Sequence, residues 1–445
     1  MLVSSRKCYL SGSDWVINSL DHLMKMTTCS GNMSQIVLML DSPLDGKNLS
    51  STVNSFAKNF PVLQGRVARD FKLTPYWKIP AACDRDVTLN VSQHTETSTL
   101  ETFLPLLEQS ANSRFADERE HLSFHLFNSS RRSALAMTFD HRLLDARGAE
   151  LFLNLFQQTL QGKGSFEKTT FTSSMELTRW GEKFLAGRNV NRRIISLSRS
   201  IPRSFSLQPG IDKSFKYRLL NFTSDETSAI LDRACSESGY LMESPFFLAV
   251  ITQAIHELFS ARSDDGSSYL IPVTTDLRSG QDILNELFFN HVSFLFYQIP
   301  VDRCQDMKEL ISQFKLQMYE NVKSGFPRDL AKASLLTRIV PLQTLGRIIR
   351  IPMSGKIATF AFSHLGKSLY DSPSFMGGNI DNLFHMPRVP VPPGIGFFTN
   401  IYNKRLNLVI SYLDKLLSED EITLLEEGIL KRFGVTTDRN RFSQN

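Results

Sequence analysis

The chain has 445 residues, of which 42% are hydrophobic and 21% are charged. This composition is typical of a globular protein and excludes a disordered or collagen-like chain. The net charge of +5 is too small for a dedicated nucleic-acid-binding protein, so we expect no nucleic-acid partner. At roughly 150 residues per domain, the length allows two or three domains, and such a chain needs no disulfide or structural metal to bury a core.

The cysteines and the N-terminal residues indicate a compartment. Five cysteines are present, which is an odd number, and none of them forms a CxxC pair. This pattern favours a reducing compartment over a disulfide framework or a zinc ribbon. The N-terminal residues contain no apolar core of a signal peptide, and no apolar run approaches the ~18 residues of a membrane span. We therefore expect a soluble, cytoplasmic protein without a membrane span.

In the first third of the chain, strand patterns and helix patterns alternate. Short apolar or alternating runs indicate strands, whereas apolar residues at i, i+3 and i+4 spacing indicate helices. The predicted elements are, in order, a strand at 34–41, a helix through Leu49, Val53 and Phe56 that Pro61 ends, strands at 121–128 and 133–141, and a helix from Ala149 to Leu160.

Between Gly162 and Phe215 the periodicity is lost, and basic residues predominate. The stretch 191–218 contains seven basic residues and one acid, Asp212. We interpret this segment as a linker, which either is solvated or meets the phosphates of a ligand or an acidic partner protein. Regular patterns then resume, with predicted strands at 269–277, 291–301, 357–363 and 407–413, and with capping boxes at Thr223/Glu226 and Ser418/Glu421.

These patterns predict an α+β protein of two lobes, each built of two layers. The predicted boundaries are an N-terminal lobe at 1–165, a basic crossover at 166–215 and a C-terminal lobe at 216–445.

His141 is the strongest candidate for chemistry among the nine histidines. It ends an apolar strand next to a turn, where a side chain is rigidly held and yet open to a ligand. An imidazole with its ordinary pKa near 6.5 is a competent general base at cellular pH. Asp145, four residues later, could orient the ring or pair with a cation. Zinc-protease, hydrolase-elbow and phosphate-loop motifs are absent, so we expect neither a metal site nor a nucleotide cradle.

The run MTFDHRLLDARGAELFL around His141 resembles the active-site motif of the CoA-dependent acyltransferase superfamily. This group includes chloramphenicol acetyltransferase, dihydrolipoyl acyltransferases, plant acyltransferases and the condensation domains of nonribosomal peptide synthetases. Asp140, His141, Arg142 and Asp145 match the DHRxxDG motif of the dihydrolipoyl enzymes. Condensation domains carry HHxxxDG, so Asp140 replaces their first histidine and Ala146 replaces the glycine of both motifs.

Weaker resemblances follow in the same order along nearly the whole chain. They are PLDGKNLSSTVNSFAKNFPVLQGRV, similar to the opening helix and strand of polyketide-associated and alcohol acyltransferases, then IPVTTDLRSG, FFNHVSFLFYQIPVD, ATFAFSHLGK and NLVISYLDKLLSEDEI. The DFGWG motif of the plant enzymes is missing. The position of His141 within 445 residues favours the two-lobed, single-chain members, which implies a monomer.

The resemblance implies two chloramphenicol-acetyltransferase-like lobes with a tunnel at their interface. It further implies transfer of an acyl group from a thioester to a small alcohol or amine, with no bound cofactor. The thioester would be an acyl-CoA or the phosphopantetheine of an acyl carrier protein. The alternative is a condensation-like module that binds a carrier protein and is either catalytically silent or forms amides.

The same resemblance assigns roles to particular residues. His141 would be the general base, and Asp145 would act structurally by pairing with Arg278 of the TTDLRSG segment. Ser363 and Asn290 are candidates for hydrogen-bond donors to the oxyanion of the tetrahedral intermediate. The predicted site therefore comprises His141, Asp145, Ser363 and Asn290 as catalytic or supporting residues, with Arg278 and Asp140 assigned to the substrate-binding region.

Overall fold

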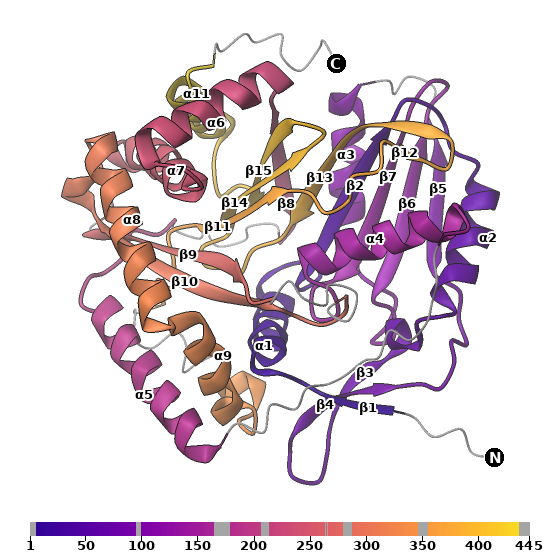
Figure 1. Ribbon diagram of the computed structural model, residues 1–445, viewed down its shortest axis with the longest axis horizontal. Coiled ribbons are helices and arrows are strands. Elements are labelled where there is room, and N and C mark those ends of the chain that lie inside the picture. Colours follow the sequence, from indigo (N-terminus) through magenta and orange to yellow (C-terminus); the bar gives the residue numbers. More distant parts are fainter. Residues whose placement is uncertain are drawn as a thin grey trace.

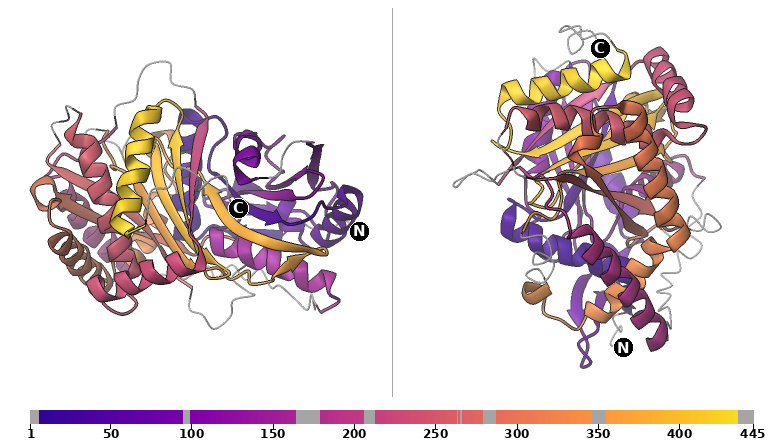
Figure 2. Two further views of the ribbon diagram at one scale, coloured as in Figure 1. Left: turned by 90° about the horizontal axis from the view of Figure 1, so that it is seen from above. Right: turned by 90° about the vertical axis from the view of Figure 1, so that its left-hand side faces the viewer.

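Two six-stranded sheets dominate the computed structural model, and a three-stranded sheet lies beside the first of them (Figure 1). The structure describes residues 6–94, 99–163, 179–205, 213–262, 264, 266–278, 287–345 and 355–435. Figure 2 shows the C-terminal helices grouped at one end of the molecule and most N-terminal elements at the other. The predicted α+β architecture of two lobes is therefore confirmed.

The N-terminal sheet has the strand order β12-β13-β2-β7-β6-β5. Its central strands β2 and β7 are buried along their full length, as their continuous apolar runs predict. Three phenyl rings, of Phe56, Phe152 and Phe156, pack α2 and α4 against one another. The elements are β2 (Met33–Leu40), α2 (Gly46–Ala57), β5 (Thr88–Gln93), α3 (Leu100–Ala111), β6 (Leu122–Asn128), β7 (Ser133–Asp140), α4 (Ala146–Leu160), β12 (Ser374–Phe375) and β13 (Gly378–Pro387).

A smaller subsheet, with the order β1-β4-β3, accompanies this lobe. A 3₁₀ turn at Pro61–Gln64 leads into this subsheet. The sequence pattern predicts that the preceding helix ends at this point. The elements of the subsheet are β1 (Arg6–Tyr9), β3 (Arg66–Arg69) and β4 (Pro75–Ile79), with the neighbouring helix α1 (Gly12–Thr27).

The C-terminal sheet has the order β10-β9-β11-β14-β15-β8, with β8 at one edge. Helix α7 is apolar on nearly all sides because it lies between this sheet and other helices. The elements are β8 (Phe215–Asn221), α6 (Ser224–Ser238), α7 (Glu243–Ser260), β9 (Ser268–Asp276), β10 (Val292–Pro300), α8 (Met307–Ser324), α9 (Phe326–Thr337), β11 (Ala361–Lys367), β14 (Ile395–Tyr402), β15 (Arg405–Leu413) and α11 (Glu419–Phe433).

Two features differ from the sequence-based expectation. The segment interpreted as a linker contains an 18-residue helix, α5 (Trp180–Leu197), which packs on α9. Only Ala186, Val190 and Leu197 of this helix are buried, so its apolar pattern is too thin to be recognised. The second difference is that β12 and β13 belong to the N-terminal sheet, although they follow residue 216 in the chain. Both predicted capping boxes are confirmed, whereas β11 begins four residues later than predicted.

Three buried asparagines connect the two sheets where β13 crosses between them. The amides of Asn382 and Asn407 bond to one another in both directions, at 2.9 and 3.0 Å. Asn407 and Asn400 also donate to the carbonyl oxygen of Leu383 on β13. All three side chains are almost fully buried. Because buried amides must be paired, this network fixes β13 of one sheet against β14 and β15 of the other.

The Asn407→Ala substitution tests this connection. It leaves the amide nitrogen of Asn382 buried without its partner, so we expect the free energy of unfolding to fall by about 1–3 kcal/mol. The control is Asn48→Ala on the exposed face of α2, which should change it by less than ~0.5 kcal/mol. Urea denaturation measures both variants; equal effects would show that the network does not stabilise the connection.

Candidate active site

His141 is the first residue after β7 and lies in the turn that leads to α4. Its backbone N–H donates to the carbonyl oxygen of Asn32 at 3.0 Å, which ties the turn to the neighbouring strand. Leu143 and Leu144 are fully buried and anchor the middle of the turn. The imidazole itself is only partly buried, so the fold presents a ring on a rigid base.

The side chain of Asn290 determines which ring nitrogen of His141 carries a proton. Its Nδ2 donates to the carbonyl oxygens of His141 and Arg142, at 2.9 and 3.1 Å. Its Oδ1 therefore faces Nδ1 of His141, at 3.2 Å, and can only accept a hydrogen bond. The neutral ring must then carry its proton on Nδ1, which leaves the lone pair of Nε2 available as a base.

This geometry corrects the predicted role of Asn290. Its amide N–H groups are already directed at two backbone carbonyls, so it is not the oxyanion donor that the resemblance suggested. Its side chain instead contacts the ring and the backbone of His141. Asn290 is almost fully buried, and its own backbone N–H donates to Oδ1 of Asp14 at 2.8 Å.

Asp14 is a supporting residue that the sequence analysis missed. It lies in the first turn of α1, where its other oxygen accepts from the backbone and hydroxyl of Ser11. Burial raises the pKa of Asp14, although the bonds from Asn290 and Ser11 oppose that effect. The only signal in the sequence is the Ser11-Asp14 capping box, which predicts a helix start and gives no indication of the distant partner.

Asp145 forms the predicted ion pair with Arg278. Its Oδ1 accepts from Arg278 at 2.7 Å and from the N–H of Gly148 at 2.8 Å, and its Oδ2 accepts from the N–H of His291 at 3.0 Å. Both side chains of the pair are almost inaccessible to solvent. Burial alone would raise the pKa of Asp145, but Arg278 and these hydrogen bonds lower it overall. The carboxylate thus joins α4 to the end of β9 and to the segment before β10.

Asp140 is not in a position to bind a substrate, contrary to the prediction. Its carboxylate is buried and accepts from Arg142 at 2.6 Å and from Nδ1 of His121 at 2.9 Å. Burial opposes ionisation, but Arg142 and His121 together hold the pKa of Asp140 well below its usual value. His121, for which the sequence indicated no partner, also contacts the carbonyl oxygen of Gly65 at 2.7 Å. Asp140 is therefore held in a buried hydrogen-bond network beneath the His141 turn.

Ser363 lies on β11 beside Thr274 of β9, whose hydroxyl donates to it at 2.7 Å. In the described part of the chain it has no hydrogen bond to His141. Strand register places Phe294 beside Thr274 and Phe398 beside Ser363, and all four side chains are partly exposed. These four side chains form a row on one face of the sheet. Val273 and Phe362 are buried on the opposite face. The row combines two phenyl rings with a hydroxyl whose own proton is free to be donated.

Glu150 is a second buried carboxylate that the sequence analysis missed. It is fully buried on α4 and accepts from Nε2 of His385 at 3.0 Å, the hydroxyl of Ser368 at 2.9 Å and the N–H of Leu369 at 2.9 Å. Burial would raise the pKa of Glu150, but these partners lower it. The contact joins α4, which begins in the catalytic turn, to β13 and to the end of β11. No residue pattern in the sequence signals these long-range partners.

Two further properties describe the chain as a whole. Within the described ranges, no three His, Cys, Asp or Glu side chains converge in a way that could hold a metal ion. None of the helices in the same ranges is both long enough and apolar enough to cross a bilayer.

The Asp145→Asn substitution tests the buried ion pair. It removes the buried counter-charge of Arg278, so we expect about 3–5 kcal/mol less stability at pH 7. Because the pKa of Asp145 is lowered, its stabilisation is present above the ordinary value of 3.8 and is lost as pH falls through the lower folded-state pKa. The stability difference between wild type and Asp145→Asn should therefore narrow only below about pH 4.

Asp276→Asn is the matched control. Asp276 also pairs with Arg278, at 3.1 Å, but its side chain is 42% exposed. We expect a loss of about 1 kcal/mol or less from this exposed partner. Urea denaturation at several pH values gives both numbers, and a similar loss for the two variants would contradict the role of the buried pair.

Comparison with known proteins identifies the fold. No family profile and no curated protein sequence matches the chain. Solved structures do match it: the TRI3 trichothecene 15-O-acetyltransferase from Fusarium sporotrichioides has a TM-score of 0.72 at 12% identity, covering 96% of this chain and 94% of that one. The first condensation domain of the calcium-dependent antibiotic synthetase, in complex with a substrate analogue, has a TM-score of 0.71 at 14% identity, covering 97% and 96%.

A third match is the F. graminearum TRI101 protein complexed with coenzyme A and deoxynivalenol. Its TM-score is 0.64 at 11% identity, covering 95% of this chain and 97% of that one. At such low identity these matches establish the fold and leave the reaction open. The chain therefore has the two-lobed fold that these acetyltransferase and condensation-domain structures share, as its motifs predicted.

Proposed function

We propose that the protein is an acyltransferase that moves an acyl group from a thioester to a hydroxyl or amine acceptor. The observation that carries this proposal is the contact between Nδ1 of His141 and Oδ1 of Asn290, which leaves Nε2 as a free base. The fold supports it, because proteins of this fold include an acetyltransferase and a protein complexed with coenzyme A.

The reaction follows from the position of that base. Nε2 of His141 takes the proton from the acceptor's O–H or N–H as the acceptor atom attacks the thioester carbonyl carbon. A tetrahedral intermediate forms, and its collapse breaks the carbon–sulfur bond. The leaving thiolate then takes the proton from the imidazolium, which yields an ester or amide, a free thiol and a neutral His141. General-base catalysis of this kind contributes about 10²–10⁴-fold.

Ser363 is the residue we assign to the oxyanion. Its hydroxyl oxygen accepts a hydrogen bond from the hydroxyl of Thr274. Its own O–H can therefore donate to a substrate oxygen. The two phenylalanines of its row would line an apolar acyl or acceptor site. In this proposal the donor and the acceptor meet in a tunnel between the lobes, and the donor is an acyl-CoA or an acyl carrier protein.

The His141→Ala substitution tests the general base. We expect a folded protein whose turnover falls by about 10²–10⁴-fold. Thiol release is measured with a panel of acyl-CoA donors, a loaded carrier protein and mixed alcohol and amine acceptors. Equal rates in wild type and variant would show that the base is wrongly assigned.

The same panel separates the alternatives. Turnover with amine acceptors and a carrier-bound donor alone would identify the amide-forming module. The absence of turnover by folded wild-type protein with every donor and acceptor would favour the silent module.

Asn290→Asp tests whether Asn290 positions the base. The carboxylate still accepts from Nδ1 of His141, but it cannot donate to the two carbonyls, and its charge stabilises the imidazolium. We expect kcat to fall by about 10–100-fold while KM changes little, because a slightly misplaced base loses rate. The pH at which kcat reaches half of its maximum should also rise, because the imidazolium loses its proton at higher pH.

A stability change alone would not move the pH profile. The control is therefore Asn154→Ala on α4, which removes a hydrogen bond to the carbonyl oxygen of Leu369 outside the catalytic turn. The positioning role is wrong if Asn290→Asp and Asn154→Ala leave the same pH profile as wild type.

A further inference from the structure

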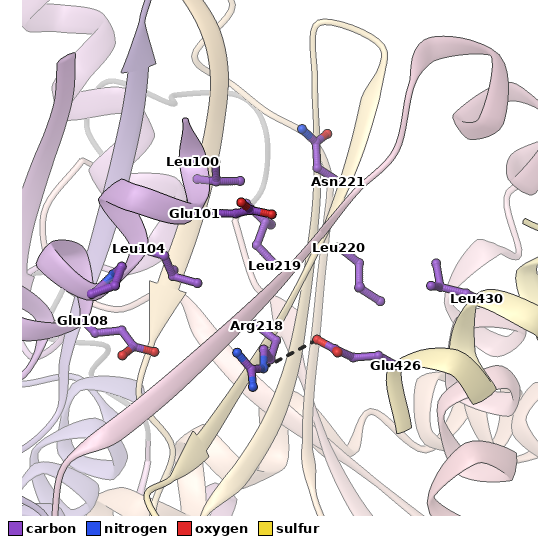
Figure 3. A pocket seen from close by; sticks show the side chains of 11 residues that line it. Leu100, Glu101, Leu104, Glu108, Arg218, Leu219, Leu220, Asn221, Glu426 and Leu430 are labelled. Atoms are coloured by element: carbon purple, nitrogen blue, oxygen red, sulfur yellow. Dashed lines mark ion pairs between the residues drawn. The ribbon is translucent and has the colours of Figure 1, made fainter. Parts of the chain in front are cut away.

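A groove of about 350 Å³ lies between α3 of the N-terminal lobe and β8 and α11 of the C-terminal lobe (Figure 3). Leucine side chains from all three elements form its apolar walls: Leu100 and Leu104 of α3, Leu219 and Leu220 of β8, and Leu430 of α11. None of its lining residues belongs to the candidate active site. The groove is therefore a separate feature that the proposed reaction leaves unexplained.

The floor of the groove is the edge of a sheet. β8 is the last strand of the C-terminal sheet, and it pairs with β15 without a register shift. The backbone N–H groups of Phe215 and Tyr217 point away from β15, since they donate at 2.8 Å to Asn112 and Glu108 of α3. Strand alternation then directs the N–H and C=O of Leu219, and the N–H of Asn221, outward as well.

These outward groups of Leu219 and Asn221 have no hydrogen-bond partner in the described part of the chain. Glu108 of α3 and the C-cap Asn112 thus cover the first half of the β8 edge, whereas no described residue pairs with the second half, which faces the groove. Proteins normally cover or charge an exposed strand edge, because it pairs readily with another chain. The open half is flanked by apolar side chains, which is the arrangement that accepts an added strand.

Polar side chains give the groove a charge preference. Oε1 of Glu426 and Oδ1 of Asn221 are buried acceptors without a hydrogen bond in the described ranges. Arg218, which also lines the groove, lies 3.8 Å from Glu426 and pairs closely with Glu419. Glu101 on α3 is exposed at the opposite wall. The groove therefore presents the carboxylates of Glu426, whose ion pair with Arg218 is long at 3.8 Å, and of the exposed Glu101 to a cationic group.

We propose that this groove binds an extended peptide segment of a partner protein, which adds as a further strand to the free half of β8 and places a basic side chain at Glu426. The backbone groups of Leu219 and Asn221 supply the main-chain hydrogen bonds. The leucine walls accept the alternate apolar side chains of the segment.

Binding should depend on pH through Glu426. Burial raises its pKa to about 7, with Glu419 and Glu427 of its own helix adding to the rise and Arg218 of β8 opposing it. Glu101 and Glu108 of α3 also line the groove. Because Glu426 gains its charge as pH rises through 7, a cationic peptide should bind more tightly at pH 8 than at pH 6.

The probe is a fluorescein-labelled, N-acetylated hexapeptide of alternating valine and lysine, titrated into the full-length protein and followed by fluorescence anisotropy. A strand pairs along one edge through alternate residues. We therefore prepare one probe with N-methyl groups on the valines and one with N-methyl groups on the lysines. Strand addition predicts that one pattern abolishes binding and that the other leaves it within about twofold.

Amide hydrogen exchange tests the position of the bound peptide, and the affinity of the Glu426→Gln variant tests the contact with its basic side chain. The unmodified probe should slow amide exchange at Leu219 and Asn221. Glu426→Gln should weaken binding by about fivefold at pH 8, whereas Glu427→Gln, the same charge change on the exposed side of α11, should alter it by less than twofold.

Three outcomes would overturn the proposal. They are no binding of the unmodified probe at either pH, equal effects of the two methylation patterns, and equal affinities of Glu426→Gln and Glu427→Gln. A fourth is binding only after deletion of residues 436–445, because it would mean that the chain's own C-terminal segment competes for the groove.

Discussion

The orientation of one buried amide determines which nitrogen of the His141 ring faces a hydrogen-bond acceptor. Asn290 cannot rotate its amide without turning its oxygen toward two carbonyl oxygens, those of His141 and Arg142. This constraint places an acceptor at Nδ1 of His141 and so defines the tautomer. The backbone N–H of Asn290 in turn donates to Asp14, which also takes part in the capping box of α1. A residue at a helix start in one lobe thus supports the residue of the other lobe that faces the His141 ring.

Both acids of the DHRLLD motif form buried ion pairs that hold the turn around His141. Asp140 neutralises Arg142 beneath the turn, and Asp145 neutralises Arg278 across the lobes. In both cases burial penalises the ionised carboxylate, and a nearby cation more than offsets the penalty. In the described part of the chain neither carboxylate has a hydrogen bond to the His141 ring, and the two ion pairs fix the backbone on both sides of it. The close spacing of charges in the motif is explained by the two ion pairs that hold the turn.

Local patterns and remote contacts were not equally predictable from the sequence. The strand before His141, the helix after it and both capping boxes depend on neighbouring residues, and the structure confirms them. Arg278 as the partner of Asp145 came from the family resemblance, and it was correct. The role of Asn290, the support from Asp14 and the entry of β13 into the N-terminal sheet all depend on contacts between residues more than a hundred positions apart. No periodicity or motif encodes such contacts, and α5 was missed because packing on a single helix requires few apolar residues.

The alanine in place of the motif's glycine is consistent with an intact turn. Ala146 is the first residue of α4 and has helical backbone geometry, which every residue except proline in the interior adopts readily. It is not among the residues with positive φ in the described chain. The position that needs a glycine is Gly148, because a Cβ there would lie 2.4 Å from the carbonyl oxygen of Leu287. The close approach of α4 to the segment before β10 therefore depends on Gly148, and that approach lets Asp145 reach both Arg278 and the N–H of His291. The sequence departure at Ala146 alone thus gives no structural reason for a silent site.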